Sequence, residues 1–287
     1  MLLKDAHKQF VDHLKDNRRS PSTVLAYGKD IEQLVEFLEG LQKSQVQDVT
    51  KDDLQAFMSK LNQNGYTAKS ISRKTNSTKT FFRYLKSEGV ITDDPANLLA
   101  HPKFDTPPPR ILSKTEYRAL RDACRGDVRT SAIVELLLQT GIRIGELTNL
   151  TLDDVRIDDK KREGVLHVST EGAVRDIPLT KAAVDALRAY LSIRPKSPNS
   201  TLFITKTGKP LLVRNIRTSI DRYLRIAGVK NARVNDLRHT WIAHHIKSGT
   251  SLIVISQLAG HKRLATTEKY LKYIEQSHDN TFKLEEL

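Results

Sequence analysis

The stretch TGIRIGEL, residues 140–147, marks a junction between two predicted helices in the second half of the chain. An apolar run precedes it, and Thr140-Gly141 is a typical place for a helix to end. Arg143 follows at once, and Glu146 begins the next helical turn. An arginine fixed at such a junction is well placed to bind a phosphate group, because its N–H donors fit phosphate oxygens. Taken alone, the pattern also fits an arginine on a solvated surface.

Upstream of this junction, the first hundred residues predict a four-helix unit. Apolar residues spaced for one helical face, a capping pattern at Thr50 and Asp53, and the breakers Gly40 and Asn64-Gly65 define it. The helices are expected near residues 3–15, 24–39, 50–63 and 67–88. Residues 101–110, HPKFDTPPPR, contain four prolines and predict a semi-rigid linker.

The second part of the chain predicts a mixture of helices and strands, which Ser113 and Glu116 open with a capping box. A hairpin is expected from residues 165–169 and 174–178, and a further short strand at 202–205. Helices are expected near residues 114–124, 128–139, 180–192, 213–227, 235–248, 251–258 and 264–275. The fold class is therefore mainly α with a small β-sheet. Two domains are expected, at residues 1–102 and 113–287, with a linker at 103–112.

The distribution of charge points to a polyanionic partner. The formal net charge is +13. Residues 1–105 hold 16 basic and 14 acidic side chains, whereas residues 206–272 hold 14 basic against 3 acidic. A local excess of this size favours nucleic acid as the partner over a merely solvated basic face.

Several other classes of protein fit the sequence poorly. No stretch reaches 18 uncharged apolar residues, so no transmembrane helix and no membrane partner are predicted. The amino-terminal residues lack the basic and apolar regions of a secretory signal. The single Cys124 cannot form a disulfide within the chain. We therefore expect a cytoplasmic protein.

Two further stretches carry residues suited to phosphate chemistry. In NDLRHTWIAHH, residues 235–245, Asn235 and Arg238 lie three apart and share one helical face. The histidines of this stretch lack the spacing and partners of a zinc site, so no metal is predicted. In LAGHKRLATTEKYLKY, residues 258–273, His261 follows a predicted helix end and Tyr270 comes nine residues later. Taken alone, Tyr270 also fits a core position.

Together these segments resemble the tyrosine recombinase family, which comprises phage integrases and Xer-type recombinases. The resemblance covers nearly the whole chain, and the helical first part looks like the family's core-binding domain. It implies a site-specific DNA recombinase in which Tyr270 forms a 3′-phosphotyrosyl link and Arg143 and Arg238 clamp the scissile phosphate. It also implies that His261 hydrogen-bonds the phosphate or supports the tyrosine, and that Glu146 braces Arg143. Such an enzyme needs no metal, no ATP and no other cofactor.

The residue types agree with that chemistry. Two guanidinium groups stabilise the negative charge that a pentacoordinate phosphorus gains in the transition state. A phenol has a pKa of about 10, so it needs positive charge or a base nearby to attack at neutral pH.

The sequence departs from the family at two positions. Asn235 stands where the family has histidine or lysine, and an amide cannot accept and release a proton as imidazole does. The lysine of the family's β-hairpin is missing, because its place falls at Thr170 or Glu171, and a glutamate there would repel the DNA backbone. The candidates for replacing this lysine are Lys160, Lys161 and Lys209.

Three functions stay open at this point. The leading one is the recombinase. The second is a DNA-binding protein that kept the fold with weak or lost catalysis. The third, a relaxing topoisomerase, is disfavoured because a small helical first domain fits recombinases better.

The expected partner is double-stranded DNA. Basic side chains of both domains are the candidate contacts to its backbone: Arg18, Arg19, Lys69, Arg73, Lys79, Arg83, Lys206, Lys209, Arg214 and Arg217. In the family, a carboxy-terminal tail docks on a neighbouring subunit, so FKLEEL at 282–287 implies a homotetramer, or a heterotetramer with a related recombinase, on two DNA sites. A frayed terminus fits the same residues.

Overall fold

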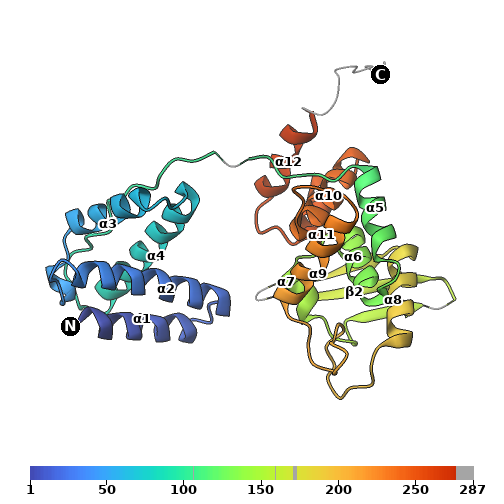
Figure 1. Cartoon of the computed structure of the whole chain (residues 1–287), viewed down its shortest axis with the longest axis horizontal. Helices are drawn as coiled ribbons and strands as arrows, with labels where there is room; N and C mark the ends of the chain where they lie inside the picture. The colour runs from blue at the N-terminus through green and yellow to red at the C-terminus, as the bar shows by residue number, and fades with distance from the viewer. Residues whose placement is uncertain (106, 159, 171–172, 276–287) are drawn as a thin grey trace. The chain divides into compact units, whose positions relative to one another are not determined.

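The computed structural model describes residues 1–105, 107–158, 160–170 and 173–275. The chain forms two compact units, Met1–Thr106 (unit 1) and Pro107–Leu287 (unit 2). Unit 1 is helical, and unit 2 combines helices with a three-stranded antiparallel sheet (Figure 1). This confirms the predicted fold class. Within the described ranges, no helix is both long enough and apolar enough to cross a membrane.

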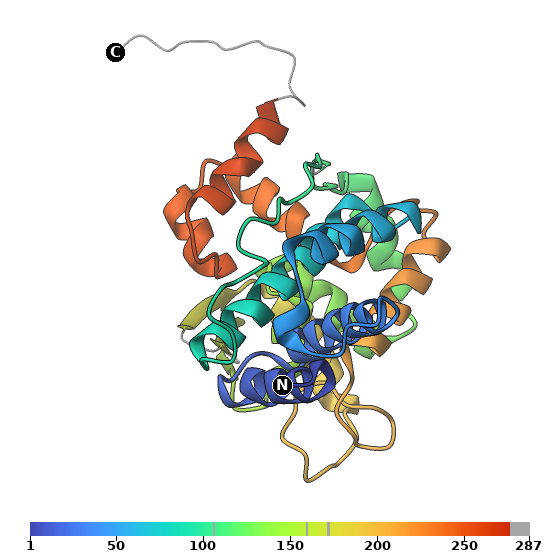
Figure 2. The ribbon, with the colours of Figure 1, turned by 90° about the vertical axis from the view of Figure 1, so that its left-hand side faces the viewer.

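Unit 1 is built from α-helices that each bury one apolar face, and from one 3-10 helix. They are α1 (Leu3–Asp16), α2 (Pro21–Glu39), the 3-10 helix η1 (Val46–Asp48), α3 (Lys51–Gln63) and α4 (Ala68–Ser87). Thr50 and Asp53 form the predicted capping box at the start of α3. In both views α1 and α2 lie side by side (Figure 1, Figure 2). Phe10, Phe81 and Phe82 are fully buried in the common core, so the predicted four-helix unit is confirmed.

Unit 2 is organised around α6 (Val128–Thr140), which is buried along nearly its whole length. The sheet has the order β1 (Val155–Asp158), β2 (Glu163–Thr170), β3 (Ala173–Leu179). The other helices are α5 (Lys114–Cys124), α7 (Ile144–Asn149), α8 (Lys181–Ile193), α9 (Val213–Ile226), α10 (Val234–Lys247), α11 (Leu252–Ala259) and α12 (Ala265–Glu275). α6 packs against α5, α8, α9, α10 and β3. The predicted hairpin is confirmed by the β2–β3 register, although its turn at Glu171-Gly172 lies outside the described residues.

The predicted strand at 202–205 is wrong. These residues take part only in the isolated bridge Ile204↔Pro210. The segment is held by separate hydrogen bonds in place of a ladder. The Tyr190 hydroxyl donates to the carbonyl oxygen of Leu202 and accepts from the amide of Ile204, each at 3.1 Å, and the amide of Leu202 donates to the carbonyl oxygen of Leu150 at 2.7 Å. Phe203 stacks on the same ring at 5.0 Å between centroids. The apolar pattern therefore reflects burial without a strand.

Strand β1 was not predicted from the sequence. Its residues, VRID, offer only two apolar side chains and no turn signal of their own. The strand forms because its residues pair with Glu163–Leu166 of β2.

Gly141 fixes the junction between α6 and α7. Its φ of +63° is a left-handed conformation that side chains other than glycine rarely adopt. A Cβ atom at this position would lie 2.3 Å from the Trp241 ring of α10. The Trp241 indole also donates to the carbonyl oxygen of Gln139 at 3.0 Å. The close packing of α10 on this turn sets the position of Arg143 relative to Arg238.

Candidate active site

Arg143 is the residue immediately before α7, and its surroundings hold it in place. Its amide donates to Glu146 Oε2 at 2.7 Å and its Nη1 donates to Glu146 Oε1 at 2.9 Å. Its Nη2 donates to the carbonyl oxygen of Gly260 at 2.7 Å. The side chain nevertheless stays 44% exposed, so the guanidinium is both fixed and open to a ligand.

Glu146 binds a second arginine from the sheet. Arg175 of β3 donates from Nη2 to Glu146 Oε2 at 2.8 Å and from Nε to the carbonyl oxygen of Leu258 at 2.8 Å. Burial alone would raise the pKa of Glu146, but the hydrogen bonds from Arg175 and Arg143 and their charges lower it. Glu146 is therefore an ionised carboxylate that holds two guanidinium groups.

Arg238, on α10, is the buried member of the cluster, with 5% of its surface exposed. Its Nη1 donates to the carbonyl oxygen of Gly141, and its Nη2 donates to that of Ala259 at 2.7 Å. Burial and the charge of Arg143 lower its pKa to about 10, which still leaves the guanidinium charged at neutral pH.

Three consecutive carbonyl oxygens at the end of α11 gather these arginines. Leu258 accepts from Arg175, Ala259 from Arg238 and Gly260 from Arg143. Gly260 has a φ of +66°, and a Cβ atom there would meet Arg175 Nη1 at 2.8 Å and Arg143 Nη1 at 3.2 Å. Only glycine lets the turn approach the guanidinium groups so closely.

His261 follows directly on this turn. Its Nδ1 lies 2.7 Å from the hydroxyl of Thr267, a buried residue in the first turn of α12. Burial, and then the charges of Arg238 and Arg143, lower its pKa to about 4. His261 is therefore a neutral imidazole at physiological pH.

Tyr270 lies on α12 and is 7% exposed. Its hydroxyl lies 2.6 Å from Nδ1 of His239, which is the residue after Arg238 on α10. Burial raises the pKa of Tyr270, and the charge of Arg238 opposes that rise. The phenol is therefore protonated at neutral pH, and it is close enough to Arg238 to feel its charge.

Asn235, the first of the two departures from the family pattern, lies one turn before His239 on α10. Its side-chain amide is exposed and lies 3.2 Å from His239 Nε2. The pKa of His239 is lowered overall. Burial has the largest effect and lowers it, the charge of Asp236 opposes this change, and the charge of Arg238 adds to it. The structure thus links Asn235, His239 and Tyr270 in one chain of hydrogen bonds.

The structure therefore brings Arg143, Arg238, His261 and Tyr270 to one region of unit 2, with Glu146 behind the arginines. Arg175 and His239 are contacts that the sequence reasoning missed. The i, i+4 spacing of Asn235 and His239 within the quoted motif could have indicated the second. Arg175 had no local signal, because its role depends on how β3 packs against α11.

The position of the missing hairpin lysine is described only in part. Thr170 ends β2 and is exposed, with its hydroxyl donating to the carbonyl oxygen of Ala173 at 3.2 Å. Glu171 lies outside the described residues. Lys160 and Lys161 lie in the turn between β1 and β2, at the opposite end of β2 from Thr170.

The residues that could bind a metal are scattered. Among the residues that the structure describes, no three His, Cys, Asp or Glu side chains are grouped as a metal site would require. His245 packs against the Trp241 ring at 4.6 Å between centroids, and His244 contacts His245.

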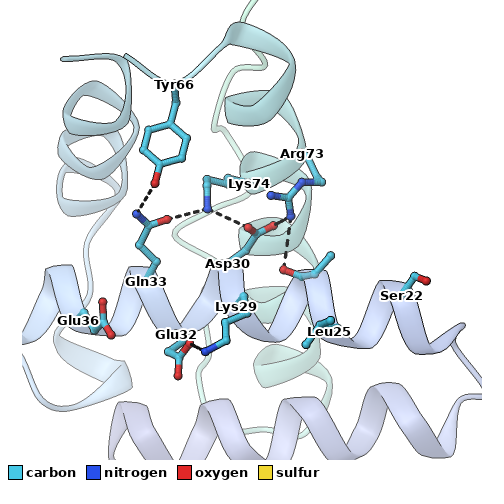
Figure 3. Close-up of a pocket in the computed structure, with 11 residues that line it drawn as sticks. Ser22, Leu25, Lys29, Asp30, Glu32, Gln33, Glu36, Tyr66, Arg73 and Lys74 are labelled. Atoms are coloured by element: carbon cyan, nitrogen blue, oxygen red, sulfur yellow. Dashed lines mark hydrogen bonds and ion pairs between the residues drawn. The ribbon is translucent and has the colours of Figure 1, made fainter. Parts of the chain in front are cut away.

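In unit 1, one of the candidate DNA contacts, Arg73, lines a pocket of about 540 Å³ between α2 and α4 (Figure 3). Arg73 and Lys74 both bind the carboxylate of Asp30, the latter at 2.9 Å. Lys79 donates to the carbonyl oxygen of Asn97 at 3.2 Å. The candidates with exposed side chains in this unit are Arg18, Arg19, Lys69, Arg73 and Arg83.

In unit 2, the four candidate DNA contacts outside the arginine cluster are all exposed. Two lie in the loop before α9 and two on α9 itself: Lys206, Lys209, Arg214 and Arg217.

The chain is similar to proteins of one family over most of its length. Residues 110–276 match the model of the phage integrase family, and residues 7–89 match that of the phage integrase N-terminal SAM-like domain. The tyrosine recombinase XerC of Roseiflexus castenholzii is 31% identical, over 91% of this chain and 86% of that protein. The XerC of Pseudomonas fluorescens is 32% identical, over 90% of this chain and 88% of that protein.

Solved structures show the same fold. A λ integrase dimer bound to a core site aligns with a TM-score of 0.74 at 18% identity, covering 99% of this chain and all of that one. A λ integrase tetramer bound to a Holliday junction aligns with a TM-score of 0.73 at 20% identity, covering 92% of this chain and 78% of that one. The chain therefore belongs to the phage integrase family, the family of the tyrosine recombinases that its sequence resembles.

Proposed function

We propose that the chain is a site-specific recombinase that cleaves and rejoins duplex DNA through a 3′-phosphotyrosyl link to Tyr270. The observation that carries the proposal is the gathering of Arg143 and Arg238 on adjacent carbonyl oxygens, with the Tyr270 hydroxyl bonded to the residue next to Arg238. Attack by the phenol exchanges one phosphate ester for another, so the energy of the broken bond is kept for rejoining and no ATP is required.

Arg143 and Arg238 are proposed to bind the non-bridging oxygens of the scissile phosphate. Each guanidinium has five N–H donors, and the bonds described above use two on each side chain. Glu146 and Arg175 are positioning residues, because they hold Arg143 and the turn at Gly260. The arginines then stabilise the charge that develops at phosphorus.

His261 and Asn235 are proposed to complete the phosphate site. A neutral His261 whose Nδ1 bonds to Thr267 has Nε2 as its second nitrogen for a phosphate oxygen. The exposed amide of Asn235 is a hydrogen-bond donor at the position where the family has histidine or lysine.

The leaving 5′-oxygen lacks the family's lysine, and this is the specific observation that favours a second candidate function. With Thr170 or Glu171 in that place, the chain could bind DNA with slow or lost cleavage. If the hairpin acts on the leaving group, Glu171→Lys should raise the cleavage rate. An unchanged or lower rate would exclude that role for the hairpin.

Assembly on DNA is proposed by analogy with the structural relatives, which are described as a dimer on a core site and a tetramer on a Holliday junction. We propose that a homotetramer, or a heterotetramer with a related recombinase, joins two duplex sites in the cytoplasm. Unit 1 and the basic side chains of α9 would contact the backbone of the duplex.

The experiment that separates recombinase from binding protein uses nicked suicide substrates carrying a site selected by binding. The recombinase forms a denaturant-resistant adduct that is lost in Tyr270→Phe. Tight binding by the unmodified chain with no adduct would favour the second candidate. The control variant is Tyr273→Phe, three residues further along α12.

A further inference from the structure

The hydroxyl of Tyr270 is held by a side chain that the family resemblance does not assign. His239 Nδ1 lies 2.6 Å from the phenolic oxygen, and the two rings are 5.8 Å apart between centroids. His239 follows Arg238 directly, so the backbone of α10 that places the phosphate-binding guanidinium also places this imidazole. The contact therefore joins the proposed nucleophile to a group that can accept a proton.

Asn235 determines which nitrogen of His239 can accept a proton. Its amide offers a donor at one end and an acceptor at the other. With Nδ2 towards His239 Nε2, the imidazole proton sits on Nδ1 and points at the phenolic oxygen. Half a turn of the amide presents Oδ1 instead, which accepts Nε2–H and leaves Nδ1 free to accept the phenol's proton.

We propose that His239 is the general base that takes the proton of Tyr270, and that Asn235 is the positioning residue that sets its tautomer. This inference rests on the proposed function. The proposal accounts for the asparagine at position 235, because the proton acceptor is then His239, one helical turn further along α10. The arrangement has the logic of a nucleophile, a base and a third group that orients the base.

Cleavage transfers one proton from Tyr270 and exchanges one bond at phosphorus for another. The Tyr270 O–H proton moves to His239 Nδ1, and the phenolic oxygen forms a bond to phosphorus. The bond from phosphorus to the 5′-oxygen breaks, and its electron pair leaves on that oxygen, which takes a proton from water. In rejoining, the 5′-hydroxyl attacks phosphorus and gives its proton to the hydroxide left by cleavage. The bond from phosphorus to the Tyr270 oxygen breaks, and the imidazolium of His239 returns its proton to that oxygen.

The surroundings favour a neutral imidazole before the reaction. The charged or titratable groups that act on His239 come from three elements: Asp236 and Arg238 on α10, His261 after α11, and Tyr270 on α12. Burial is the largest influence and lowers the pKa of His239 below its usual 6.5. A base with a lowered pKa carries no proton at pH 7 and gains one only as the phenolic oxygen bonds to phosphorus.

The test is single-turnover adduct formation on a suicide substrate between pH 5 and pH 9, at saturating DNA. His239→Asn keeps an oxygen near the phenol that can accept a hydrogen bond but not the proton. It is expected to slow cleavage by about 10²- to 10⁴-fold, the usual range for a lost general base. His244→Asn, on the same helix but exposed, is the matched control.

The pH profile separates a base from a structural contact. The unmodified chain should be flat above pH 7 and lose rate below the lowered pKa of His239, because protonation removes the base. His239→Asn should gain rate about tenfold per pH unit between 7 and 9, since only ionised phenol then reacts. A second variant, Asn235→Asp, places a carboxylate at His239 Nε2 and should move the acidic loss of rate to higher pH by about one unit.

The outcomes are distinct. If His239→Asn cleaves within about threefold of the unmodified chain, or if Asn235→Asp leaves the acidic limb in place, the inference is overturned and the proposed function stands. If the unmodified chain forms no adduct, the proposed function falls and this inference with it.

Discussion

Each unit of the molecule contains a buried carboxylate that binds two basic side chains. The two sites differ in how much positive charge remains without a carboxylate partner. In unit 1, Asp30 is 3% exposed and binds Arg73, Lys74 and the Ser77 hydroxyl. In unit 2, the side chain of Glu146 is 4% exposed and binds Arg143 and Arg175. Both carboxylates tie together segments that are far apart in the sequence.

The difference lies in a third cation. Unit 2 adds Arg238, whose bonds in the described residues go to carbonyl oxygens and not to a carboxylate. The site thus places three guanidinium groups near one carboxylate, which binds only two of them, and the surplus positive charge suits a phosphodiester. In unit 1, Lys74 is buried and is also bonded to Gln33, so the cluster mainly pins α4 to α2 (Figure 3). We therefore propose that the same motif serves stability in unit 1 and phosphate binding in unit 2.

Among the substitutions that test this comparison, Arg238→Lys should have the largest effect, and the effect should be a loss of DNA cleavage. Lysine keeps the charge but lacks the planar fork that reaches Gly141 and Ala259 together. Cleavage should fall by about 10²- to 10³-fold, as for the loss of one transition-state donor. Single-turnover adduct formation measures it, with the exposed Arg118→Lys on α5 as control. A loss below tenfold would mean that charge alone matters here.

Asp30→Asn should lower the free energy of unfolding of unit 1. It leaves Lys74 buried without its carboxylate, and losing one partner of a buried ion pair costs about 3 kcal/mol or more. Denaturant unfolding of the full chain should show that loss in unit 1. The exposed Asp93→Asn should change stability little. Equal effects from the two substitutions would contradict the assigned role of Asp30.

The acid sensitivity of unit 2 should depend on Glu146. Its folded pKa lies below the usual 4.5, so its stabilising contribution is complete above that value and is lost as pH falls through the folded pKa. Glu146→Gln should be less stable than the unmodified chain at pH 7, and the gap should narrow between pH 5 and pH 3. Unfolding at several pH values measures this, with the exposed Glu163→Gln as control. A gap that stays constant with pH would rule the ion pairs out as its cause.

The smallest effect should come from Arg73→Gln. Its side chain is 45% exposed beside Asp30, so the account predicts one backbone contact to DNA at most. Losing it should lower the slope of log affinity against log salt by about 0.9. Titrations at several salt concentrations measure the slope, and Lys8→Gln on α1 provides the control. An unchanged slope would remove Arg73 from the interface.

The sequence predicted the family, the fold class and nearly every helix, because those depend on local periodicity and on short motifs. It failed where tertiary packing decides. Residues 202–205 looked like a strand, but their hydrogen bonds go to the Tyr190 hydroxyl and to separate backbone groups, not to a neighbouring strand. Arg175 carried no local sign of its contact with Glu146, which arises only when β3 meets α7 and α11. His239 follows Arg238 directly in the sequence, but its contact with Tyr270 depends on where α12 packs.

We propose that two arginines and one tyrosine act on a single DNA phosphate. The most direct measurement digests the covalent adduct with protease and nuclease and locates the nucleotide by mass spectrometry. We expect a nucleotide on the peptide that contains Tyr270, with the modification on that residue and none after Arg238→Lys under the same conditions. A nucleotide on Tyr273, or undiminished labelling of the Arg238 variant, would contradict it.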